Sequence, residues 1–180
     1  MDNSEQRKVN TIAKQLGATL ITNGQDILKG AFKVSPKKIL SKSELGTWLK
    51  NNTFPGASLW DEKYYFEDIS FYNSLIKHYW GFHKKYITDR YDCDNYAFAF
   101  SSMVSDIFGI NTAGVASGEV YNKDTDKLID RHAYNLIVAK ENGKLKPFLF
   151  EPMKNMITEW KGQKTELDVW KYVIQWQEFF

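Results

Sequence analysis

The sequence predicts an α+β fold in which helices come first and an antiparallel sheet follows. Apolar residues repeat at helical spacing between residues 93 and 108, and short β-type runs follow them. Asn142-Gly143, a strong hairpin signal, joins two of these runs. The chain has 180 residues, of which 43% are apolar and 16% aromatic, which is the composition of a globular protein. This length favours a single domain, residues 1–180.

The N-terminal third is expected to be helical. "SKSELGTWLKNN" offers Ser41 or Ser43 as an N-cap and then places Leu45, Trp48 and Leu49 at helical spacing. We therefore expect an N-terminal helical extension over residues 1–60 and a catalytic core over residues 61–180.

The stretch from Trp60 to Trp80 is dense in aromatic residues, and a helix there would carry one apolar stripe. These residues fit a buried core, although aromatic side chains also line ligand grooves. Near the C-terminus, "TELDVWKYVIQWQEFF" fits either a helix or a final strand, and its periodicity does not separate the two.

Charge and composition exclude several classes of partner. The 24 basic and 22 acidic residues leave a net charge of +2, which argues against nucleic-acid and membrane-surface binding. No apolar run approaches the roughly 18 residues that a membrane span needs. The polar start, "MDNSEQRKVN", lacks the apolar core of a signal peptide, and one cysteine cannot form an internal disulfide. A cytoplasmic location is the simplest expectation.

The single cysteine lies in "RYDCDNYAFAF", at the predicted start of the helix that Gly109 ends. A thiol at a helix N-terminus faces free N–H groups and the positive end of the helix dipole, and both stabilise the thiolate. The flanking Asp92 and Asp94 oppose this effect, because nearby negative charge raises the pKa of a thiol. They can cap the helix or, with oxygen ligands, help to hold a hard cation.

A nucleophilic cysteine needs a base and a group that orients it. His132 begins the run "HAYNLIVAK", and an even-length loop centred on Asn142-Gly143 sets this histidine opposite Met153. Glu151 is then the diagonal neighbour of His132 on the same face of the next strand. An odd loop length would move Glu151 to the other face. The predicted site is a triad of Cys93, His132 and Glu151.

"DCDNYAFAF", a strand that opens with "HAYN" and another that ends in "EP" resemble the papain-like and transglutaminase-like cysteine hydrolases. Within that superfamily the pattern is most similar to a protease domain at the C-terminus of a fungal agglutinin and to related phage and bacterial proteins. The resemblance covers roughly residues 86–155. It implies a nucleophile at a helix N-terminus packed on an antiparallel sheet.

The resemblance also implies roles for the residues of the triad. Cys93 would be the nucleophile, His132 the general base and acid, and Glu151 the group that orients the imidazole. The reaction would be acyl transfer from a protein or peptide substrate, to water in a protease or amidase and to an amine in a transglutaminase-type enzyme. No cofactor is required, although calcium or manganese at Asp92 and Asp94 is an alternative to helix capping.

A second hypothesis is that the protein is not an enzyme. The same fold would serve as a non-catalytic protein-binding module, or as a phage or bacterial inhibitor that blocks a partner by binding it. The reactivity of Cys93 in the folded protein distinguishes these hypotheses, because a cysteine of the core is alkylated only on unfolding.

Overall fold

The computed structural model describes residues 24–32, 34, 38–53, 56–78, 80, 87–88 and 92–180. The first 23 residues of the expected helical extension lie outside this set. The chain forms two compact units, residues 1–33 and residues 34–180. In the first unit, residues 24–31 form a helix. All further description concerns the second unit.

A seven-stranded sheet dominates the second unit, in the order β2-β9-β4-β5-β6-β7 with β8 paired to β9. Only β2 and β9 are parallel among these pairs; the others are antiparallel. A separate two-stranded sheet joins β1 to β3. The strands are β1 (Lys38–Ser41), β2 (Ser58–Leu59), β3 (Lys63–Phe66), β4 (Ala113–Asn122), β5 (Leu128–Glu141), β6 (Lys144–Glu151), β7 (Met156–Glu159), β8 (Thr165–Leu167) and β9 (Trp170–Phe179).

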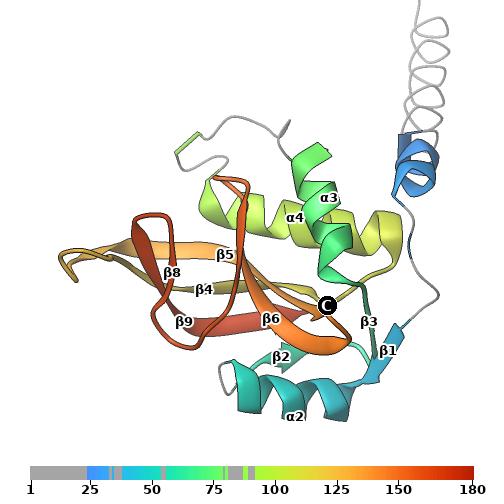
Figure 1. The fold of residues 1–180 in the computed structure, drawn as a ribbon, viewed down its shortest axis with the longest axis horizontal. Helices are drawn as coiled ribbons and strands as arrows, with labels where there is room; N and C mark the ends of the chain where they lie inside the picture. The colour runs from blue at the N-terminus through green and yellow to red at the C-terminus, as the bar shows by residue number, and fades with distance from the viewer. Residues whose placement is uncertain are drawn as a thin grey trace, which may run out of the picture. The chain divides into compact units, whose positions relative to one another are not determined.

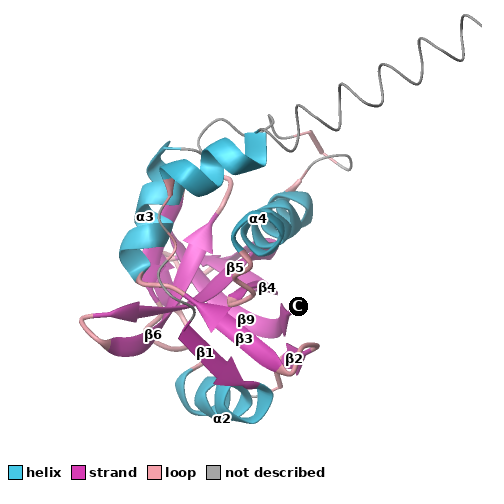
Figure 2. Ribbon diagram, turned by 90° about the vertical axis from the view of Figure 1, so that its right-hand side faces the viewer, coloured by secondary structure: helices cyan, strands magenta, loops and turns pink. Residues whose placement is uncertain are grey.

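Helices cover both faces of the large sheet. Figure 1 shows α3 (Ile69–His78) and α4 (Cys93–Phe108) above it and α2 (Lys42–Asn52) below it, and Figure 2 shows the same layers from the side. The face toward α2 carries the larger core cluster, in which Leu45 and Leu49 of the helix meet alternate residues of β4, β5 and β9. Burial of these apolar side chains is the main source of stability for this layer.

Two local predictions are confirmed, one at the start of α2 and one at the β5–β6 hairpin. Ser41 is the N-cap of α2, and its backbone N–H donates to Glu44 Oε2 at 2.7 Å in a capping box. Asn142 and Gly143 both have positive φ, 51° and 79°, as a tight hairpin turn requires. The turn sets Glu141 opposite Lys144, and the register continues unbroken to Asn135 opposite Phe150.

The expected order of helices first and a sheet afterwards is wrong. Strands β1 and β2 lie within residues 38–59, which were expected to belong to a helical extension. The C-terminal run, for which the sequence left helix and strand open, is the strand β9. Its inward-facing residues, such as Tyr172 and Ile174, are fully or almost fully buried in the α2-side core. The spacing of apolar residues could not identify this segment as a strand, because its pairing with β4 decides its conformation.

One glycine allows β4 and β9 to approach each other closely. A Cβ on Gly118 would lie 1.8 Å from the carbonyl oxygen of Val173 and 2.9 Å from the nitrogen of Gln175. The β4–β9 register shifts between Ser117 and Gly118, so the bulge depends on the missing side chain. Both obstacles are backbone atoms, which cannot rotate away.

We therefore expect Gly118→Ala to lower the free energy of unfolding by about 3 kcal/mol or more. Gly46→Ala is the matched control, because its Cβ would meet only Leu59 Cδ1 at 3.4 Å inside α2. That change should raise stability by up to about 1 kcal/mol, since glycine is unfavourable within a helix. Urea denaturation measures both variants, and equal stability of the two would contradict this role of Gly118.

Candidate functional site

The thiol of the candidate site lies at the start of a well-defined helix. Cys93 is the first residue of α4, and Asp92 is its N-cap with extended backbone. The backbone N–H of Asp92 donates to Asn95 Oδ1 at 3.2 Å, and Asn95 N–H donates to Asp94 Oδ1 at 2.8 Å. Gly109 closes the helix in the left-handed conformation, at φ 65°. The helix therefore begins and ends at the residues that the sequence predicts.

The hairpin brings the histidine and the acid together. His132 Nε2 lies 2.7 Å from Glu151 Oε2. Ladder pairing between β5 and β6 ends at Asn135 and Phe150, so Glu151 lies just beyond the paired region. From there the Glu151 carboxylate reaches the imidazole of His132. The contact predicted from the loop length is present.

Glu151 is completely buried, and three groups surround its carboxylate. Beside the imidazole, the hydroxyl of Tyr172 donates to Oε2 at 3.0 Å, and the backbone N–H of Met153 donates to Oε1 at 3.0 Å. A buried carboxylate is costly unless such partners satisfy it. The arrangement fixes the orientation of His132, whose side chain is 9% exposed.

Cys93 joins this group through a hydrogen bond to the imidazole of His132. The pKa of the thiol is lowered, first by a hydrogen bond to His132 and further by the backbone N–H of Ala133 and the charge of His132. Burial and the charge of Asp92 act in the opposite direction and raise this pKa, but they do not cancel the lowering. Burial acts to lower the pKa of His132, but hydrogen bonds to Cys93 and Glu151 outweigh it and raise this pKa to about 9. Since Glu151 contacts Nε2, Nδ1 is the ring nitrogen left for the thiol. The interaction therefore favours the thiolate of Cys93 and the protonated form of His132.

Sequence reasoning missed the aromatic side chains around His132. Trp170 meets the imidazole edge to face, with ring centroids 5.3 Å apart, and Lys154 Nζ lies 3.7 Å above the indole ring. Tyr134 and Tyr172 flank the same imidazole at 6.3 and 6.4 Å between centroids. Tyr134 lies two residues after His132 in the same strand, so the alternation of side chains along a strand predicts that both lie on the same face. Nothing in the local sequence pointed to Trp170 or Tyr172, because they come from β9.

The two aspartates beside Cys93 do not converge. Asp94 is exposed on the first turn of α4, whereas Asp92 is half-buried at the N-cap. Within the part of the chain that the structure describes, no group of three His, Cys, Asp or Glu side chains is arranged to hold a metal ion. Calcium or manganese at these aspartates remains a prediction that no observation tests.

Comparisons with known proteins give a family and a fold. A family model described as the ricin-type β-trefoil lectin C-terminal domain matches residues 60–169, more than half of the chain. A solved structure titled "PSL1a-E64 complex" is similar with a TM-score of 0.55 and 17% sequence identity. The match covers 78% of this chain and 51% of that one, so the chain spans about half the length of this neighbour. A search of curated proteins finds no match.

These findings overturn the family expected from the short motifs. The model that matches describes a domain of lectins, and neither description names a papain-like or transglutaminase-like protein or a thiol protease. The cysteine hydrolase predicted as the main function therefore gives way to the alternative of a binding module. No helix among the described residues is long and apolar enough to cross a membrane.

Proposed function

We propose that this chain, which belongs to the family of ricin-type β-trefoil lectin C-terminal domains, is a binding module whose ligand site is formed by Cys93 and His132, with the buried Glu151 holding the imidazole in place. The observation that carries the proposal is the 2.7 Å contact between His132 Nε2 and the buried Glu151 carboxylate. Perturbed ionisable groups of this kind concentrate at functional sites. A fold that needed Cys93 only for packing would gain nothing from an imidazolium beside it.

The charges of the site favour a ligand with a polar acceptor. With the pKa of His132 at about 9, the imidazole is positively charged near neutral pH, while its two N–H groups face Glu151 and Cys93. The first N–H groups of α4 add further donors beside the thiol. A carbonyl or carboxylate oxygen on the ligand would accept from these N–H groups and would be attracted by the positive charge of the imidazolium.

Exposed aromatic residues near the thiol favour a peptide or peptide-like ligand. Phe98 and Phe180 stack with centroids 6.1 Å apart, and Phe98 remains 42% exposed. Cys93 and Phe180 pack against the same small cluster, made of Ala97, Val115 and Ala133. An apolar side chain of the ligand would cover this aromatic surface while a backbone carbonyl accepts from the N–H groups at the start of α4. Protein or peptide is accordingly the class of ligand that we propose.

E64, the ligand named for the structural neighbour, is the first compound to test on this chain. Intact mass spectrometry and calorimetry would follow its binding to the full chain. We expect binding at one site, lost in Cys93→Ser and weakened at least tenfold in His132→Ala. Ser102→Ala, an exposed position on the same helix, should bind E64 as the unaltered chain does.

Two results would overturn the proposal. Equal binding of E64 by the unaltered chain and by Cys93→Ser would separate the ligand from the site. Repeated turnover of a peptide or protein mixture, lost in Cys93→Ser, would make the site catalytic and a binding-only function incorrect. Retention of turnover by Cys93→Ser would point to a contaminant instead.

A further inference from the structure

The end of β9 carries a carboxylate between two aromatic side chains, next to the cluster that holds Cys93. Trp176 and Glu178 alternate with residues that face the α2-side core, so they lie on the α4 side of the sheet, as Phe180 does. Phe180 packs against the same small cluster as Cys93, and Val115 of that cluster is paired with Glu178. Neighbouring strands are about 4.8 Å apart, so Glu178 lies one strand away from this cluster.

An exposed indole is held against the Glu178 carboxylate. Trp60 Nε1 donates to Glu178 Oε1, and the pairing of Ser58 with Glu178 brings the start of this segment to the same edge of the sheet. The backbone N–H of Trp60 also donates to the carbonyl of Phe179 at 3.2 Å. Although Trp60 is 69% exposed, these two hydrogen bonds restrict its ring. A restricted ring lowers the entropy that is lost when a ligand binds to it.

The carboxylate of Glu178 has spare capacity to accept hydrogen bonds. Within the described part of the chain, Trp60 is its side-chain donor and no lysine or arginine forms an ion pair with it. An ionised carboxylate offers about four acceptor positions, of which this hydrogen bond uses one. Glu178 is also half-buried, so its charge attracts a cation more strongly than a fully exposed charge would. The strip formed by Trp60, Trp176, Glu178 and Phe180 therefore favours a positively charged partner.

The chemistry of this strip narrows the partner to a guanidinium or ammonium group on an aliphatic stem. Cations are attracted to the faces of aromatic rings, most strongly to that of tryptophan. A guanidinium can also form two parallel hydrogen bonds with a carboxylate and stack on an indole. The aliphatic stem of such a side chain would cover part of the aromatic surface. An anion would be repelled by Glu178, and an apolar group would leave this half-buried carboxylate desolvated without a partner.

We infer that Glu178, Trp60 and Trp176 form a subsite for a basic side chain, arginine or lysine, of a peptide ligand. This inference rests on the proposed function, because it concerns the peptide that would bind at Cys93. An apolar residue of the same peptide would lie on Phe180, so the ligand would carry an apolar and a basic residue close together in its sequence. The affinity of the subsite for a single basic residue should be about millimolar, as expected of a small exposed site.

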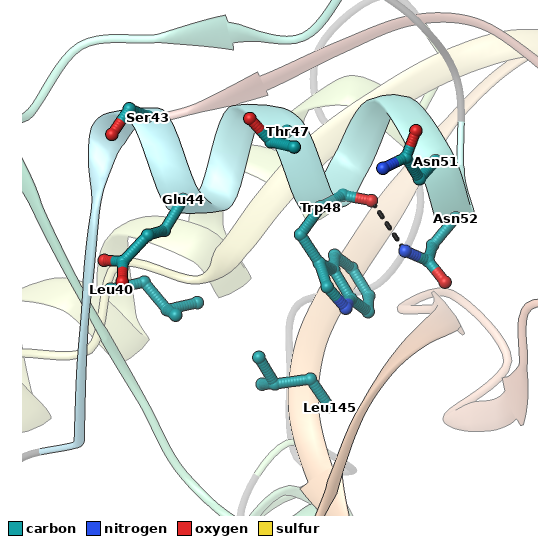
Figure 3. A pocket seen from close by; sticks show the side chains of 8 residues that line it. All are labelled: Leu40, Ser43, Glu44, Thr47, Trp48, Asn51, Asn52 and Leu145. Carbon is teal, nitrogen blue, oxygen red and sulfur yellow. Dashed lines mark hydrogen bonds between the residues drawn. The ribbon is translucent and has the colours of Figure 1, made fainter.

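A cavity on the other face of the sheet supplies an internal reference for a test by NMR. It has a volume of about 490 Å³ and lies beside α2, where Trp48 projects from the helix toward Leu145 (Figure 3). Glu44 is the ionisable residue of the described lining, and its carboxylate is engaged in the capping box of α2. The indole signal of Trp48 should therefore stay in place when a cationic ligand moves the signals of Trp60 and Trp176.

The test is a titration of the full chain with Nα-acetyl-arginine amide and with its neutral isostere, Nα-acetyl-citrulline amide, followed through the indole N–H signals in ¹⁵N NMR spectra. We expect the arginine derivative to shift the Trp60 signal in a saturable manner and to bind at least about fivefold more tightly than the citrulline derivative. Glu178→Gln keeps the volume and an acceptor for Trp60 but removes the charge, so it should weaken arginine binding by about the same factor. Glu166→Gln removes the same charge from an exposed position on β8 and should bind normally.

Three outcomes would overturn this inference. They are unmoved Trp60 and Trp176 signals, equal affinity for the arginine and citrulline derivatives, and an unchanged affinity for the arginine derivative in Glu178→Gln. Cys93→Ser should bind the arginine derivative as the unaltered chain does, because the subsite does not include the thiol. Loss of arginine binding in a chain that binds E64 through Cys93, and arginine binding in a chain that does not bind E64, are therefore separate results.

Discussion

Replacing Glu151 by alanine should lower the free energy of unfolding by about 3–5 kcal/mol, the usual cost of removing one member of a buried ionic pair. The carboxylate is fully buried and satisfies the His132 ring, the Tyr172 hydroxyl and the Met153 N–H. Without it, the Nε2 N–H of His132 and the Tyr172 hydroxyl remain buried and lose this acceptor. Urea denaturation at neutral pH measures the loss.

Two further variants make this result specific. Glu151→Gln keeps the volume and an acceptor oxygen, so it should cost less stability while the pKa of His132 falls from about 9. Glu166→Ala removes an exposed acid from β8 and should change stability by no more than about 0.5 kcal/mol. If Glu151→Ala were as stable as Glu166→Ala, the buried carboxylate would not hold this site together.

Replacing His132 by alanine should slow iodoacetamide labelling of Cys93 at pH 6 by about tenfold or more. The hydrogen bond to His132 is the largest cause of the lowered thiol pKa. A lowered pKa means that the thiolate persists at lower pH, so labelling of the unaltered chain should begin below the range of a free thiol, whose pKa is about 8.5. In the variant the onset should move to higher pH.

The effect of His132→Ala on the rate of Cys93 labelling should disappear or reverse in alkaline solution. Above the pKa values of both thiols the two rates should converge, and the variant can then be the faster, because a thiolate of higher pKa is the stronger nucleophile. A Cys93→Ala, Ser102→Cys variant is the matched control, since it places an exposed thiol on the same helix away from His132. Labelling of the unaltered chain only after denaturation, or with the pH profile of this control, would show that Cys93 has no ionised partner.

The candidate site was predictable where the determining contacts are local. Asn142 and Gly143 fix a two-residue turn, which sets the pairing of β5 with β6. This hairpin brings together His132 and Glu151, which are fewer than twenty residues apart in the chain. The spacing of apolar residues and Gly109 likewise determine where α4 begins and ends. The capping pattern of Ser41 and Glu44 determines the start of α2 in the same way.

Other parts of the site could not be predicted, because residues far apart in the chain decide them. Tyr172 reaches Glu151 only because β9 pairs with β4, and that pairing depends on a bulge at Gly118. The sequence left this strand open between helix and strand. The short motifs around Cys93 and His132 also favoured a family that the comparison over residues 60–169 overturned.

By itself, then, the sequence determined the helix that starts at Cys93, the hairpin around Asn142-Gly143 and the His132–Glu151 contact that follows from its register. Only the tertiary structure decided that β9 lies inside the sheet, that Tyr172 and Trp170 surround His132, and that Trp48 and Leu145 line a cavity. Turns and helix caps are set by neighbours in the chain, which the sequence displays directly. Strand order and packing depend on the summed burial of residues more than a hundred positions apart, for which no local pattern exists.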